Sequence, residues 1–108
     1  MRYTVYITLA AWRDLEEITD WVAENDSSAH ANFLLDRLLQ TAESVAESPH
    51  RGSRPAELPA GINAEFRQVF FKPYRIVYKI AEDRVIIYLI ADGRRSLQSI
   101  LLRRLSAG

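Results

Sequence analysis

The sequence contains no cysteine, which excludes disulfide bonds and any zinc or redox site built from thiolates. Glycine and proline are scarce, with four of each in 108 residues, so the composition is not that of a flexible, low-complexity chain. Long apolar runs are also missing, because the longest, residues 85–91, is too short to span a bilayer. The first residues alternate apolar and polar side chains like a strand, whereas a signal peptide needs a longer apolar block. We therefore expect neither export nor membrane insertion, and a cytoplasmic location.

The chain length predicts a single domain, residues 1–108, built around one core. The formal net charge is zero, but the two halves of the chain are oppositely charged. Residues 1–50 hold three basic and nine acidic residues, a net charge of −6, whereas residues 51–108 hold eleven basic and five acidic residues, a net charge of +6. Such asymmetry indicates either a surface that meets an anionic partner or acidic helices that offset a basic sheet within the molecule.

Hydrophobic periodicity predicts an α+β fold with the element order β-α-α-β-β-β-α. Residues 9–25 form the first helix, with Ala11, Leu15, Ile18 and Val22 at helical spacing and the remaining positions mostly acidic. Cap-forming side chains at residues 24–29 end it. A second helix then extends to residue 48 with an apolar stripe of its own, formed by Ala31, Leu34, Leu35, Leu38, Ala42 and Val45. So short a connection predicts an antiparallel helical hairpin.

The second half of the chain predicts a sheet. Residues 48–63 concentrate proline and glycine, and we expect neither a helix nor a central strand there. Residues 65–71, 74–80 and 84–91 are β-branched and aromatic, with breaks short enough for an antiparallel meander. The last strand is apolar on both faces and is therefore expected inside the sheet. A final helix, capped by Ser96, carries an apolar stripe of Leu97, Ile100, Leu101 and Leu105. The predicted architecture is a helical hairpin packed on a mainly antiparallel sheet.

Signatures of common enzymes are missing from the sequence. It has neither a glycine-rich phosphate loop of the GxxxxGKS kind nor a GxSxG elbow. The two histidines, His30 and His50, have no second ligand at metal-binding spacing. We therefore expect no metal and no cofactor.

Arginines on the predicted strands and before the last helix stand out. Strand alternation places Arg75 with Val77 and Lys79 on one face of the sheet. An arginine there either pairs with a carboxylate of the helical hairpin or presents its guanidinium group to a phosphate or carboxylate of a ligand. Arg94 and Arg95 precede the last helix, where the helix dipole disfavours cations. Their position therefore indicates an interaction other than one with the helix dipole.

The order of five segments resembles the RelE/ParE toxin superfamily, and specifically its ParE branch. The segments are WRDLEEITDWV, ANFLLDRLLQTAESVAESP, RGSRPAEL, YRIVYKI and VIIYLIADGRRSLQSILLRRL, and the resemblance extends from residue 3 to residue 105. It implies the toxin of a bacterial type II toxin-antitoxin system, neutralised by a small ParD-like antitoxin in a hetero-oligomer. In the ParE branch the target is DNA gyrase, and growth arrest follows when replication stops. The RelE branch cleaves messenger RNA on the ribosome, so the fold does not choose between the two mechanisms.

The residues favour inhibition of DNA gyrase over cleavage of messenger RNA. RNA cleavage through the 2′-hydroxyl needs a base, cations for the phosphate and an acid. Arg75 and Arg95 match arginines of the RelE-like enzymes, but neither tyrosine nor histidine follows Arg95. Arg67 supplies a cation and not a base, because arginine stays protonated, while His50 in its loop remains an alternative base. We therefore predict that the protein is no enzyme and that Arg67, Arg75, Arg94 and Arg95 form a basic patch that binds gyrase or the DNA it holds. A ribosome-dependent endoribonuclease and a nontoxic protein-binding module remain the alternatives.

Trp12 and Trp21 flank the apolar stripe of the first helix. If exposed, they would anchor the antitoxin, whose amphipathic helix we expect in a groove lined by the hairpin, with an extended stretch against a sheet edge. The alternative is that both tryptophans belong to the core of the toxin.

Overall fold

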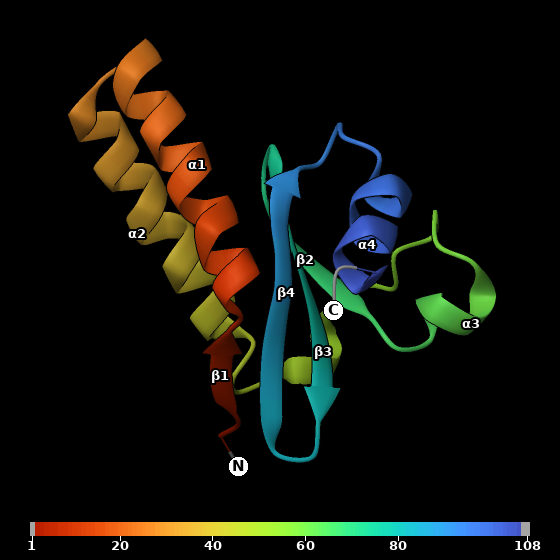
Figure 1. Ribbon diagram of the computed structural model, residues 1–108. Coiled ribbons are helices and arrows are strands. Elements are labelled where there is room, and N and C mark those ends of the chain that lie inside the picture. Colours follow the sequence, from red (N-terminus) through yellow and green to blue (C-terminus); the bar gives the residue numbers. More distant parts are fainter. Residues whose placement is uncertain (1, 107–108) are drawn as a thin grey trace.

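The computed structural model describes residues 2–106, with side chains up to residue 104, and has the predicted α+β fold. The helical hairpin and the meander of strands occur in the predicted order (Figure 1). The elements are β1 Thr4–Ile7, α1 Leu9–Asn25, α2 Ser28–Ser44, the 3₁₀ turn Pro49–Arg51, α3 Ala60–Asn63, β2 Arg67–Phe71, β3 Tyr74–Ala81, β4 Arg84–Asp92 and α4 Leu97–Ser106. No helix in this part of the chain is long and apolar enough to cross a membrane.

The four strands form one mixed sheet in the order β1-β4-β3-β2. The β2–β3 and β3–β4 pairs are antiparallel, and β1 runs parallel to β4. The strand β4 is therefore interior, as its apolar sequence predicts, because β1 covers one of its edges and β3 the other. Val85, Ile87 and Leu89 are all nearly inaccessible to solvent. Most of the sheet is antiparallel, as predicted.

The hairpin of α1 and α2 covers one face of the sheet (Figure 1). Each of its helices begins at a hydroxyl cap, since Thr8 Oγ1 accepts from the backbone N–H of Ala11 at 3.1 Å and Ser27 Oγ accepts from that of His30 at 3.0 Å. The larger core lies between hairpin and sheet, with Leu15, Leu38, Ile76, Tyr78 and Ile87 at its centre. The second helix ends at residue 44 and not at residue 48 as predicted.

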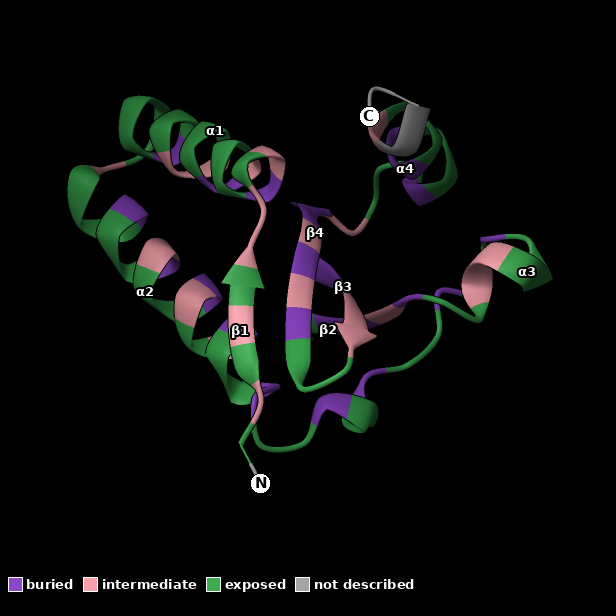
Figure 2. Cartoon of the chain, turned by 60° about the horizontal axis from the view of Figure 1, so that its bottom comes forward, coloured by how far each residue is buried: buried purple, intermediate pink, exposed green. Residues whose placement is uncertain are grey.

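The opposite face of the sheet carries α4 and the segment that contains α3 (Figure 2). Leu97, Ile100 and Leu101 are buried there with Phe66, Val77, Leu89 and Leu58 in a second core, as the stripe of α4 predicts. Ser96 Oγ accepts from the backbone N–H of Ser99 at 3.4 Å, which confirms the predicted cap. The side chain of Leu105 lies outside the described residues.

The prediction that residues 48–63 contain no helix is wrong at two places. A 3₁₀ turn begins at Pro49, and Pro59 is the residue immediately before α3. Proline lacks an N–H group, but the first turn of a helix leaves that donor unpaired anyway, so proline is compatible with a helix start. Two very short helices therefore fit within the proline-rich segment.

Candidate functional site

A cleft of about 440 Å³ opens between α1 and the ends of β3 and β4. Its apolar lining comes from Ile18 and Trp21 of α1 and from Tyr74 and Ile90 of the sheet. Its charged lining consists of three carboxylates and two guanidinium groups, those of Asp14, Glu17, Asp92, Arg94 and Arg95. The cleft therefore combines an apolar surface with charges of both signs.

Arg94 is held at the rim of this cleft by Asp92. The guanidinium Nε donates to Asp92 Oδ1 at 2.9 Å and Nη2 to Oδ2 at 2.5 Å, while the backbone N–H of Arg94 also donates to Oδ1. The hydrogen bonds from Arg94 lower the pKa of the Asp92 carboxyl to about 2. Asp92 thus supplies the negative charge that compensates a cation before α4, where the helix dipole disfavours it. The Arg94 side chain is nevertheless 83% exposed.

Arg95 is exposed, and its backbone N–H donates to the carbonyl of Asp92 at 3.1 Å, which fixes the turn between β4 and α4. Within residues 2–104, no hydrogen bond or ion pair of its side chain is recorded. The turn therefore presents two neighbouring guanidinium groups, one held by a carboxylate and one available to a partner.

Asp14 links the cleft wall to the sheet. Its Oδ2 accepts a hydrogen bond from the backbone N–H of Ile90 at 3.0 Å, beyond the point where β1 stops covering β4. Nothing in the sequence marks this contact, because Asp14 is one of several acidic residues on α1. The carboxylate satisfies a sheet N–H that would otherwise lack a strand partner.

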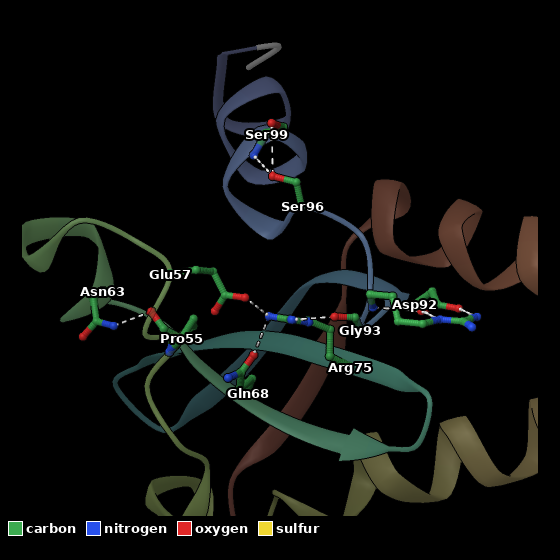
Figure 3. Close-up of polar contacts among 10 residues, drawn as sticks. Pro55, Glu57, Asn63, Gln68, Arg75, Asp92, Gly93, Ser96 and Ser99 are labelled. Atoms are coloured by element: carbon green, nitrogen blue, oxygen red, sulfur yellow. Dashed lines mark hydrogen bonds and ion pairs between the residues drawn. The ribbon is translucent and has the colours of Figure 1, made fainter.

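Arg75 lies inside the protein and not on a surface patch, since it is 8% exposed. Its guanidinium group donates to Glu57 Oε2 at 2.8 Å, to Gln68 Oε1 at 3.1 Å and to the carbonyl of Gly93 at 2.9 Å (Figure 3). The carboxylate that pairs with Arg75 is that of Glu57, in the loop before α3. The alternative that its partner lies on the helical hairpin is therefore wrong. Arg75 therefore differs from Arg94 and Arg95 in burial, although its guanidinium group reaches the carbonyl of Gly93, the residue before Arg94.

Arg67 lies in a third environment. Its Nη1 donates to the carbonyls of His50 at 3.1 Å and Gly52 at 2.9 Å, at the end of the sheet away from the cleft. The four arginines predicted to form one exposed patch therefore differ in environment. Arg94 and Arg95 are exposed in the turn before α4, Arg75 is buried behind that turn, and Arg67 lies at the other end of the sheet.

Both tryptophans are exposed on α1. Trp12 is 41% exposed and Trp21 is 63% exposed, so the alternative that both belong to the core is wrong. Trp21 lines the cleft beside Arg94 and Arg95, which no sequence pattern had linked to it. Among residues 2–106, no group of three or more histidine, aspartate or glutamate side chains is arranged to hold a metal ion.

The fold is shared with solved structures of toxin-antitoxin proteins. Three solved structures superpose on the chain. The first, from a chromosomal ParDE toxin-antitoxin system of P. aeruginosa, gives a TM-score of 0.71 at 17% identity. This superposition covers 84% of this chain and 96% of that one. The RelBE2 toxin-antitoxin complex of Mycobacterium tuberculosis gives 0.64, 22% identity and coverage of 85% and 92%. A mutant of the E. coli toxin RelE in the free state gives 0.62, 15% identity and coverage of 99% and 98%.

Sequence comparison assigns the branch. Residues 5–97 match the family of ParE toxins of type II toxin-antitoxin systems, parDE. Toxin ParE3 of Caulobacter vibrioides is 27% identical over 88 residues, which cover 82% of this chain and 84% of that protein. The chain belongs to the ParE toxin family, as its segment order predicts.

Proposed function

We propose that this ParE-family toxin inhibits DNA gyrase in the bacterial cytoplasm, blocks replication and so arrests growth, until a ParD-like antitoxin binds it. Gyrase as the target follows from the resemblance to the ParE branch. The structural observation that supports it is the cleft, where Arg94 and Arg95 lie beside exposed Trp21. Arginine and tryptophan are enriched among the residues that dominate protein–protein binding energy.

The charges of the cleft favour a protein partner over a nucleic acid. Asp14, Glu17 and Asp92 line it together with the two arginines. Asp92 and Asp14 already compensate Arg94 and a second arginine, Arg104, so little net positive charge remains in the cleft to attract a polyanion, and Glu17 opposes its binding. A protein surface with both signs of charge matches the lining better, so we assign the contact to gyrase itself and not to the DNA that gyrase holds.

We also propose that the toxin acts by binding and not by cleaving RNA. Of the two arginines that match RelE-like enzymes, Arg75 is already engaged by Glu57, Gln68 and Gly93. A phosphate would have to displace a carboxylate that lies 2.8 Å from the guanidinium group. The turn after Arg95 offers no tyrosine or histidine as acid or base.

Neutralisation follows from the same geometry. An antitoxin segment that packs an apolar side chain against Trp21 enters the cleft that also contains Arg94 and Arg95. The antitoxin segment in the cleft would cover the two guanidinium groups, so antitoxin and gyrase would compete for one surface.

Two assays with the purified toxin test the target. A gyrase reaction on plasmid DNA is expected to show lost supercoiling and accumulated cleaved plasmid, and added antitoxin is expected to restore supercoiling. In parallel, a translation extract is expected to keep its messenger RNA intact. Cut messenger RNA together with undisturbed supercoiling would contradict the proposal and identify an endoribonuclease. Inactivity in both assays would indicate a nontoxic binding module.

A further inference from the structure

A second cavity, of about 390 Å³, lies where β2 begins, and its charge is strongly positive. It is lined by His50 and Arg54 of the loop before α3 and by Arg67 and Lys79 of the sheet, with Glu65 at its edge. We propose that this cavity is a binding site for a phosphate group, carried either by a nucleic acid or by inorganic phosphate.

The site is separate from the cleft proposed to bind gyrase. Lys79 lies five residues after Tyr74 on β3, and Tyr74 lines the cleft, so the two are about 16 Å apart along the strand. Phosphate binding here goes beyond gyrase inhibition and does not depend on it. Each proposal has its own readout, and either one can fail alone.

Charge balance is the first argument for an anion. Arg54, Arg67 and Lys79 bring three positive charges to the described lining, whereas Glu65 brings one negative charge. Lys79 Nζ lies 3.3 Å from Glu65 Oε1, and the two side chains are 34% and 55% exposed, so this is a weak, exposed pair. Two positive charges thus remain in a concave surface, where they attract an anion.

The orientation of the guanidinium groups is the second argument. Arg54 Nη1 donates to the carbonyl of Ala64 at 2.5 Å, and Arg67 Nη1 donates to the carbonyls of His50 and Gly52. Carbonyl groups fix the direction of each guanidinium group without neutralising its charge. A guanidinium group has five N–H donors, and within the described part of the chain only Nη1 of each is recorded as donating. The remaining donors suit the paired oxygens of a phosphate.

The loop that carries His50 is held in place, which is the third argument. The buried hydroxyl of Tyr78 donates to the carbonyl of Pro49 at 2.6 Å and accepts from the backbone N–H of Gly52 at 3.2 Å. A Cβ atom at Gly52 would overlap that hydroxyl, so glycine allows this close approach. The cations therefore converge on a loop that is fixed before any ligand arrives, which reduces the ordering cost of binding.

The test is a titration of the full-length toxin with inorganic phosphate and with a short single-stranded oligodeoxynucleotide, followed by NMR at constant ionic strength. Saturable shifts of the Arg54, His50 and Lys79 signals are expected. Lys79→Gln is expected to weaken binding about tenfold, as for loss of one charged hydrogen bond. Glu65→Gln is expected to tighten it, and since a misfolded protein would not bind more tightly, this variant separates a charge effect from a folding defect.

Lys72→Gln is the matched control, because Lys72 is exposed in the turn between β2 and β3 and outside the cavity lining. It is expected to leave binding unchanged. The titration is then repeated at several salt concentrations. Tighter binding of the oligonucleotide than of phosphate, with a salt dependence that falls by about one ion in Lys79→Gln, identifies a nucleic-acid phosphodiester as the ligand. The reverse order identifies free phosphate. The proposal is overturned if neither probe gives a saturable response, or if Lys72→Gln and Lys79→Gln weaken binding equally.

Discussion

Asp14 of α1 and Arg104 of α4 form an ion pair, with Asp14 Oδ1 and Arg104 Nη2 2.8 Å apart, although ninety positions separate them in the chain. Arg104 also donates to the carbonyl of Tyr88 at 2.6 Å, and Asp14 accepts from the N–H of Ile90. The two side chains are 16% and 22% exposed. This pair ties the terminal helix to the opposite side of the sheet.

Asp14→Asn is expected to lower the free energy of unfolding by about 2 kcal/mol, because a partly buried charged hydrogen bond is lost. Urea denaturation measures the loss of unfolding free energy. The exchange rates of backbone amide hydrogens are expected to rise most in α4. Asp20→Asn, an exposed acid on the same helix, is the control and should change little. Equal stability of the Asp14 and Asp20 variants would show that the pair contributes nothing.

Charge reversal at both Arg94 and Arg95 is expected to abolish growth arrest. Arginine hot spots in interfaces are worth about 2 kcal/mol or more each, so loss of both should lower the affinity for gyrase about 1,000-fold. Expression in bacteria and a gyrase binding assay measure the effect. The doubly reversed Arg13→Glu and Arg103→Glu variant, at two exposed arginines outside the cleft, is the control. Full toxicity of the Arg94 and Arg95 variant, with its fold intact, would show that these two residues do not contact the target.

Trp21 is expected to become shielded when the antitoxin binds, because it is 63% exposed in the free chain and lines the cleft. Acrylamide quenching of tryptophan fluorescence, with and without antitoxin, measures this shielding. The single variants Trp21→Phe and Trp12→Phe assign the change to one residue or both. Unchanged quenching in the complex would place the antitoxin elsewhere.

The ion pair of Asp92 and Arg94 predicts how the stability of the fold depends on pH in the acid range. The hydrogen bonds from Arg94 lower the pKa of Asp92 from the ordinary value of 3.8 to about 2 in the folded chain, so the folded state favours the ionised carboxylate. The resulting stabilisation is present above pH 3.8 and is lost as the pH falls towards 2. The stability difference between the natural chain and Arg94→Gln should therefore shrink over this range. A difference that stays constant down to pH 2 contradicts the assignment, and Arg103→Gln serves as the control.

Tyr78→Phe is expected to destabilise the fold by about 1–3 kcal/mol, since it leaves the carbonyl of Pro49 and the N–H of Gly52 without their buried partner. Thermal unfolding measures the loss. Burial raises the pKa of the Tyr78 hydroxyl, so the hydroxyl stays protonated and able to donate at mildly alkaline pH. Tyr74→Phe, a tyrosine at the edge of the cleft with no recorded hydrogen bond of its hydroxyl among the described residues, is the comparison.

The elements of this protein were predictable because their signals are local. The stripe of α1 from Ala11 to Val22 and the alternation around Arg75 each depend on neighbours within a few positions. The short helix α3 departs from the prediction, because proline excludes the interior of a helix but is compatible with its start. The order of these elements also indicated the ParE branch, which the family match confirmed.

The candidate site was only partly predictable. Arg94 and Arg95 are adjacent in the chain and line one cleft, and their role in binding the target stays a prediction. Arg75 and Arg67 differ from them in environment, and strand alternation alone does not distinguish a buried arginine from an exposed one. Their partners, Glu57 for Arg75 and the carbonyl of His50 for Arg67, come from a loop whose path no periodicity describes.

The sequence by itself determined the long helices, the strands and the family, because amphipathic period and segment order are properties of consecutive residues. Only the tertiary structure decided which charges meet. Ion pairs and hydrogen bonds require atoms within a few ångströms, and that distance depends on how distant segments pack. Packing therefore buried Arg75 against Glu57, left Trp21 beside Arg95, and gathered Arg54, Arg67 and Lys79 around one cavity.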